Sequence, residues 1–240
     1  NLVREHPNYQ LIENHENKGF AAGNNQGVAV ASSEFVMLLN NDVLVSDGWL
    51  EGLVESLERD EKIGMVGPIT NSISGRQMVR AVPYTDENGF HDFAQRVRET
   101  YNGQLTPRYR IAGFAVLMRK ALYGEVGGLD ESFGTGNYED DDLCLKIRGK
   151  GYAIMVDESV FIHHYRSQTF IENKIDYRNN LSVNEPMFRK KWPHVDYEEL
   201  LELHNSLVDE NATLLTQCQQ ALDVGNIGEA IALYSKILNT

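Results

Sequence analysis

The sequence predicts an α/β protein with a sheet domain and a helical tail. The chain has 240 residues, and at about 150 residues per domain this allows one large domain or one domain with an appendage. Short apolar runs alternate with amphipathic ones, which is typical of a mainly parallel sheet with flanking helices. After Pro193, leucines recur at helical spacing. We therefore place the sheet domain at residues 1–195 and the tail at residues 196–240.

The first elements follow from local patterns. Residues 9–12 are a candidate strand, and a glycine- and asparagine-rich segment at 19–27 leads into a short helix of small residues at 28–31. Residues 35–39 form a continuous apolar run, as expected for a central strand buried on both faces. Ser46 and Asp47 then cap a helix whose apolar positions are three to four residues apart.

The middle of the chain is harder to assign, because the pattern between residues 70 and 110 loosens into glycine, proline and mixed polar residues. In α/β enzymes such an excursion often shapes the substrate site. The remaining predicted elements are strands at 63–66, 115–118, 152–156 and 160–162, and helices near 90–100, after Arg119 and Lys120, and at 139–148.

The end of the chain, residues 218–238, resembles a tetratricopeptide helical hairpin, with Gly225 in the turn and Ala230 at the helix crossing. One hairpin cannot bury its own apolar face, since about three repeats are needed. Either the array continues or the hairpin packs on the preceding domain, and a plain amphipathic helix pair remains the alternative. We expect the tail to bind a protein partner.

Composition narrows the classes of function. The formal net charge is -13, which argues against a nucleic-acid binder, because such affinity comes from Lys and Arg. Two cysteines cannot form a secreted-type disulfide framework, and no apolar run approaches the ~20 residues of a membrane span. We expect a cytoplasmic protein whose substrate can lie at the inner face of a membrane.

Three polar groups follow the predicted strands or open a helix. Asn40, Asn41 and Asp42 stand at the carboxyl end of the most buried strand, where open α/β sheets bind ligands. A carboxylate beside an amide can hold Mg²⁺ or Mn²⁺, although the same triplet is a common turn. His163 and His164 follow an apolar strand, where a neutral imidazole can complete a metal site that begins at Asp42.

The third group is a run of four carboxylates, residues 139–142, that opens a helix. Acidic residues in a first turn are favoured by the helix dipole, but four are more than capping needs. Mutual repulsion raises the pKa of one member of such a cluster, and that carboxylate can then accept a proton as a general base.

The order and spacing of these groups resemble glycosyltransferase family 2, the GT-A-fold proteins, in the branch of bacterial rhamnosyltransferase-like enzymes. The resemblance covers residues 11–167. Its most specific segments are residues 14–27, 38–42, 127–131 and 138–146.

The resemblance implies transfer of a sugar from a nucleoside-diphosphate sugar to an acceptor hydroxyl on a glycan, cell-surface polysaccharide or protein, with inversion and with Mn²⁺ or Mg²⁺. Asp42 is the implied metal ligand, with His163 as a further ligand and His164 as its alternative. Asn40 replaces the first aspartate of the family's Asp-x-Asp motif. Asp140 is the implied base, supported by Glu139 and Asp142. The implied donor-binding residues are Gly19, Gly23, Asn24, Asn25, Asn40, Asn41 and Arg166.

The first elements of the family have no counterpart in this sequence. Family members begin with a strand, a loop, a helix and a second strand that form much of the nucleotide-base pocket. The eight residues before Tyr9 are too few to build that unit, so we expect a chain truncated at its N-terminus. Two alternatives stay open: a non-catalytic sugar-nucleotide-binding or assembly module, and a nucleotidyltransferase. The second is disfavoured because the sequence has no glycine-rich, lysine-containing triphosphate loop near its N-terminus.

Overall fold

The computed structural model describes residues 9–79, 81–165 and 177–196, and residues 200, 229, 232 and 233 of the tail. The chain divides into two compact units, Asn1–Val195 and Asp196–Thr240. The predicted tetratricopeptide hairpin falls almost wholly outside the described residues and stays a prediction. Among the described residues, no helix is both long and apolar enough to span a bilayer.

A six-stranded sheet forms the centre of the first unit. Its strands are β1 (Phe35–Leu39), β2 (Val43–Leu44), β3 (Ile63–Thr70), β4 (Leu105–Arg108), β5 (Ala115–Arg119) and β6 (Ala153–His164). The strand order is β1-β5-β3-β6-β2, and β4 also pairs with β6. Among the described strands only β3 and β6 pair in parallel. The expectation of a mainly parallel sheet is therefore wrong in this part of the chain, because β5 runs antiparallel to both of its neighbours.

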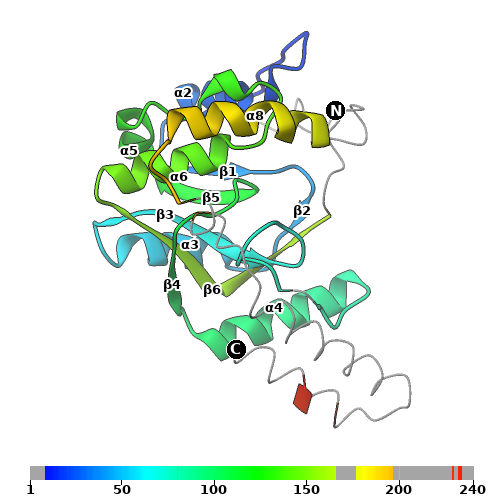
Figure 1. The fold of residues 1–240 in the computed structure, drawn as a ribbon. Coiled ribbons are helices and arrows are strands. Elements are labelled where there is room, and N and C mark those ends of the chain that lie inside the picture. Colours follow the sequence, from blue (N-terminus) through cyan, green and yellow to red (C-terminus); the bar gives the residue numbers. More distant parts are fainter. Residues whose placement is uncertain are drawn as a thin grey trace. The chain divides into compact units, whose positions relative to one another are not determined.

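Helices cover both faces of this sheet. They are α2 (Gly19–Val30), α3 (Trp49–Glu58), α4 (Glu87–Tyr101), α5 (Lys120–Glu125), α6 (Glu139–Gly149) and α8 (Tyr177–Lys191), with a 3-10 turn at Glu131–Phe133. One hydrophobic cluster contains residues of α2, α4 and α6, and a second contains residues of α3. In Figure 1, α2, α5, α6 and α8 are seen above the strands and α4 is seen below them.

Most predicted elements form, with five differences. The run at 35–39 is a strand, but it lies at the edge of the described sheet and only Val36 and Leu38 in it are buried, so it is not a central strand buried on both faces. The next helix, α3, has Gly48 at its N-cap and no side-chain cap, so neither Ser46 nor Asp47 caps it. Residues 9–12 form no strand, and Tyr9, Leu11 and Ile12 are exposed. The helix predicted at 28–31 begins nine residues earlier, at Gly19, whose N–H donates a hydrogen bond to the Asn17 side chain. The last two predicted strands are one strand, β6, which has an irregularity in its pairing with β3.

Candidate active site

Asp42 and His164 meet at one edge of the sheet. The short strand β2 pairs with the end of β6 and sets Val43 opposite His164. Asp42 Oδ1 then lies 3.2 Å from His164 Nε2, with both side chains nearly buried. Asp42 Oδ1 receives no hydrogen bond from the described residues, and the Asn40 amide nitrogen lies 3.5 Å from the same Nε2. Two donor atoms typical of metal sites therefore face each other.

Contacts from neighbouring strands fix the orientation of the His164 ring. The ring lies 2.8 Å from the Ser72 carbonyl through Nδ1, and a carbonyl only accepts, so Nδ1 carries the hydrogen. In the neutral imidazole the lone pair of Nε2 then faces Asp42. The Asn71 amide bonds both the N–H and the carbonyl of His164, and the Phe114 ring stacks on the imidazole with centroids 5.2 Å apart. Such outer contacts are typical of metal-binding histidines.

His163 faces the opposite side of β6, since successive side chains of a strand alternate. A 2.6 Å hydrogen bond joins its Nδ1 to the Tyr84 hydroxyl, and its ring packs against Tyr84 and Tyr165. Burial, with the neighbouring His164, lowers the pKa of His163. The structure thus brings the alternative, His164, and not His163, beside Asp42.

Asp140 lies in the first turn of α6 and is connected to the same edge. Its Oδ2 accepts the Gly113 N–H at 2.9 Å, and its Oδ1 accepts the Asp141 N–H at 3.0 Å. Phe114, the next residue after Gly113, accepts the Asn40 N–H through its carbonyl at 2.8 Å. The two residues Gly113 and Phe114 therefore join the expected base to the expected metal ligands.

The other carboxylates of the run have different environments. Glu139 is buried, and desolvation together with the charge of Asp140 raises its pKa to about 8. Asp141 forms a 2.6 Å ion pair with Arg110, and burial still raises the pKa of this carboxyl. Asp140 is the only one of the four carboxylates that is not buried.

Asp142 is bound by basic and indole groups that link α6 to α8. Its fully buried carboxylate receives Lys146 and Lys191 at 2.7 Å each and the Trp192 indole N–H at 2.9 Å. Because every one of these donors comes from α6 or from the end of α8, Asp142 holds the two helices together.

The expected donor-binding residues of α2 are mostly engaged elsewhere. The Asn25 side chain bonds both the N–H and the carbonyl of Leu129 and also contacts Glu131, so it tethers that turn. Asn24 donates to the Phe20 carbonyl within the helix. Gly19 has φ +82, and a Cβ there would collide with the Gly134 carbonyl. Such a position requires glycine.

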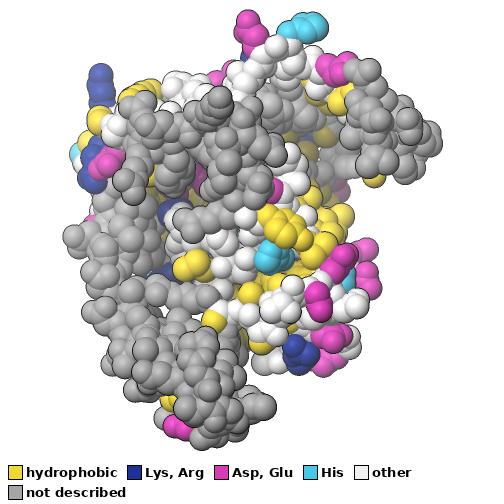
Figure 2. All heavy atoms as spheres, turned by 90° about the vertical axis from the view of Figure 1, so that its right-hand side faces the viewer, with side chains coloured by type: hydrophobic (Ala, Val, Ile, Leu, Met, Phe, Trp, Pro, Cys, Tyr) yellow, Lys and Arg dark blue, Asp and Glu magenta, His cyan; other side chains and the backbone are white. Residues whose placement is uncertain are grey.

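The remaining expected donor-binding residues are less constrained. Gly23 has open space where a Cβ would stand, and Asn41 is exposed beside Asp42. Arg166 lies outside the described residues. Figure 2 shows the side that carries β2 and the end of β6, where hydrophobic and histidine side chains are exposed together with acidic ones beside them.

Sequence patterns missed several residues of this edge. Asn71 carried a usable signal, since it is a polar residue directly after a buried strand, as Asn40 is. Gly113 and Phe114 carried none, because their importance comes from the strand that places them between Asn40 and Asp140.

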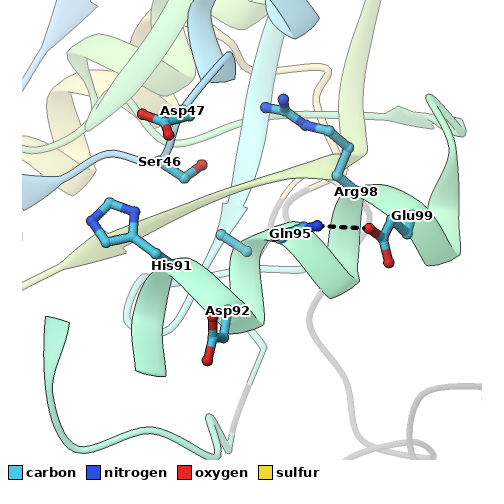
Figure 3. A pocket seen from close by; sticks show the side chains of 8 residues that line it. Ser46, Asp47, His91, Asp92, Gln95, Arg98 and Glu99 are labelled. Atoms are coloured by element: carbon cyan, nitrogen blue, oxygen red, sulfur yellow. Dashed lines mark hydrogen bonds between the residues drawn. The ribbon is translucent and has the colours of Figure 1, made fainter. Parts of the chain in front are cut away.

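A separate hollow of about 390 Å³ lies between α4 and the segment after β2 (Figure 3). Ser46 and Asp47 line one side, and α4 lines the other with residues that include His91, Arg98 and Glu99. It contains none of the expected site residues.

Comparison with known proteins tests the family that the sequence resembles. The family model "Glycosyl transferase family 2" matches residues 1–124, which is more than half of the chain. A pre-mycofactocin glycosyltransferase of Mycobacterium tuberculosis is 28% identical over 70% of this chain and 34% of its own length. An uncharacterized Mycobacterium bovis protein is 30% identical, covering 70% of this chain and 67% of the relative. The chain spans about a third or less of the first three curated relatives it matches.

Two further proteins are similar at lower identity. An N-acetylglucosaminyl-diphospho-decaprenol L-rhamnosyltransferase of Mycobacterium tuberculosis is 24% identical, over 70% of this chain and 62% of the relative. A mannosyltransferase from Pyrobaculum calidifontis, solved in complex with GDP-Man and Mn²⁺, superposes with a TM-score of 0.52 at 18% identity, covering 96% of this chain and 69% of that one. The chain belongs to glycosyltransferase family 2 and has the GT-A fold.

Proposed function

We propose that this chain transfers a sugar from a nucleoside-diphosphate sugar to an acceptor hydroxyl, with inversion at the anomeric carbon and with the help of Mn²⁺ or Mg²⁺. The observation that carries the proposal is the facing pair of Asp42 and His164, joined through Gly113 and Phe114 to Asp140. Relatives named as glycosyltransferases support the same reaction class.

The residues at this edge fit a divalent cation. Cis ligands of an octahedral ion with bonds of about 2.1 Å lie about 3 Å apart, and Asp42 Oδ1 and His164 Nε2 are separated by 3.2 Å. Carboxylate oxygen and imidazole nitrogen both suit Mn²⁺. The Asn40 amide can turn its oxygen toward the same point, because the two ends of an amide are exchanged by a flip. A bound cation would act as a Lewis acid for the diphosphate leaving group.

Asp140 is the proposed general base. Two backbone N–H groups orient its carboxylate, and the residue is accessible enough to meet a substrate hydroxyl. As the acceptor oxygen attacks the anomeric carbon, its proton passes to Asp140 while the bond from that carbon to the diphosphate breaks. The attack comes from the face opposite the leaving group, so the anomeric configuration inverts.

The wider setting is proposed on the same basis. The acceptor is a glycan, a cell-surface polysaccharide or a protein, and residues 196–240 bind a protein partner. The presence of only two cysteines favours a reducing cytoplasmic setting, including the inner face of a membrane.

The test is turnover of nucleoside-diphosphate sugars by the full-length protein with Mn²⁺. Asp140→Asn is expected to lower kcat by about 10²–10⁴-fold, as loss of a general base does, and Asp42→Ala is expected to weaken metal-dependent donor binding. Glu55→Gln, at an exposed carboxylate of α3, is the matched control. Unchanged turnover in both site variants would refute the assigned roles.

One observation keeps a second function in view. Asn40 occupies the place of the motif's first aspartate, which removes a negative charge from the metal site. A non-catalytic sugar-nucleotide-binding module would show donor binding by calorimetry without turnover of any acceptor, whereas the proposed transferase shows both.

A further inference from the structure

The loop directly before α6 has an unusual backbone. Gly136, Asn137 and Tyr138 all have positive φ, at 141°, 78° and 77°. Residues other than glycine rarely adopt this conformation, so two of these three positions are disfavoured unless the surroundings hold them. Asp140, the proposed base, lies two residues after Tyr138 in the sequence. The position of the base therefore depends on whatever holds this loop.

Asn184 of α8 makes the central contact with the loop. Its amide nitrogen donates toward the carbonyls of Phe133, Gly136 and Asn137 at 2.8, 2.9 and 3.2 Å. Because all three partners can only accept, the NH₂ group and not the amide oxygen must face the loop. The side chain is 5% exposed, so water cannot easily replace these bonds.

Other residues of α8 hold the loop on either side of this contact. Asn180 donates to the Thr135 hydroxyl at 2.6 Å. The buried Phe188 ring lies 5.0 Å from the Tyr138 ring, measured between centroids. The end of the helix binds Asp142, two residues beyond Asp140, through Lys191. The loop before the base and the turn after it are thus both attached to one helix.

We infer that Asn184 is a positioning residue for catalysis: by binding three carbonyls of the loop before α6, it fixes the place and orientation of Asp140. The inference rests on the proposed function. Asn184 touches neither donor nor acceptor in this role, and it acts through the backbone of residues 133–138. Loss of its NH₂ group lets the loop relax toward ordinary backbone angles, and Asp140 moves from Gly113.

The test uses two substitutions of the same residue in the full-length protein. Asn184→Asp keeps the volume of the side chain and replaces the donor NH₂ by an acceptor oxygen, and Asn184→Ala removes the whole amide. Val183→Ala is the control, because Val183 is the preceding residue of α8 and is 55% exposed. For each variant, kcat, KM for the donor, Mn²⁺ affinity and amide hydrogen exchange of residues 134–139 are measured.

Both Asn184 variants are expected to lose at least about tenfold in kcat, up to the roughly 100-fold that a misplacement of about 1 Å can cost. The donor KM and the Mn²⁺ affinity should stay within about twofold, as expected when only transition-state interactions are lost. Amides of the loop should exchange faster in both variants and not in Val183→Ala.

Two results would overturn the inference. One is faster loop exchange with unchanged kcat, because the loop would then not position the base. The other is a decrease in kcat and in Mn²⁺ affinity by the same factor, accompanied by a lower folded fraction, because Asn184 would then serve stability alone. An inactive wild-type protein would refute the proposed function instead, and the exchange measurement would still report whether Asn184 holds the loop.

Discussion

The two adjacent histidines allow a sharp test of the proposed metal site. His164→Ala removes the imidazole whose Nε2 faces Asp42 at 3.2 Å, whereas His163→Ala removes the imidazole that binds the Tyr84 hydroxyl on the other face of β6. The two changes are the same in chemistry and lie one residue apart. Only the first is expected to affect the cation.

The expected size of each effect follows from what each imidazole contacts. Losing even an outer partner of a metal ligand costs 10–100-fold in affinity, so losing a ligand itself should raise the Kd for Mn²⁺ by about 100-fold or more, or about 2.7 kcal/mol. His163→Ala should leave this Kd unchanged. It should instead lower the free energy of unfolding by about 1–2 kcal/mol, since the partly buried Tyr84 hydroxyl loses its partner.

The assay is titration of the full-length protein with Mn²⁺ in the presence of a nucleoside diphosphate. Binding is detected by calorimetry or by the spectrum of free Mn²⁺. Because the His164 side chain is nearly buried, His164→Asn serves as a second variant whose amide can still donate to the Ser72 carbonyl while Nε2 is absent. The reasoning fails if His163→Ala weakens Mn²⁺ as much as the folded His164 variants do, or if those variants bind Mn²⁺ normally.

Two further predictions concern stability. The pKa of Glu139 is raised to about 8, so between about pH 4.5 and pH 8 the folded state holds a proton that the unfolded state has lost, and folding stability falls as the pH rises through this range. Glu139→Gln should therefore become more stable relative to the wild type as the pH rises across that range. A stability difference that does not depend on pH would contradict this. Gly19→Ala should destabilise the protein because its Cβ meets the Gly134 carbonyl, whereas Gly23→Ala, in open space within α2, should stabilise it by about 0.5–1 kcal/mol. Thermal unfolding compares the two, and a changed donor KM in Gly23→Ala would support the proposed donor role of that residue.

Local sequence patterns predicted the type of several elements well. The continuous apolar run at Phe35–Leu39 is a strand, and the carboxylate run at 139–142 opens a helix as expected. The helix start is predicted correctly because a favourable first turn is a property of a short stretch of chain. The expected burial of Phe35–Leu39 on both faces is wrong, because this strand lies at the edge of the described sheet and only Val36 and Leu38 in it are buried. The helix Gly19–Val30 was predicted to begin too late, because its many glycines and asparagines have low helix propensity. Its tertiary contacts, such as Asn25 with Leu129, are invisible in the local pattern.

The choice between the two histidines shows where sequence reasoning ends. Strand periodicity states that His163 and His164 face opposite sides, but not which side carries Asp42. That depends on the pairing of β2 with β6, in which Val43 lies opposite His164.

The four consecutive carboxylates show how a helix turns one motif into separate functions. Successive residues of a helix point about 100° apart, so neighbours in the sequence meet different surroundings. Glu139 is buried, Asp141 pairs with Arg110, and Asp142 binds the lysines that attach α8. Asp140 alone is partly exposed and held by backbone N–H groups. The paired carboxylates of Asp141 and Asp142 therefore fix the helix, whereas Asp140 stays accessible for its proposed role as the general base.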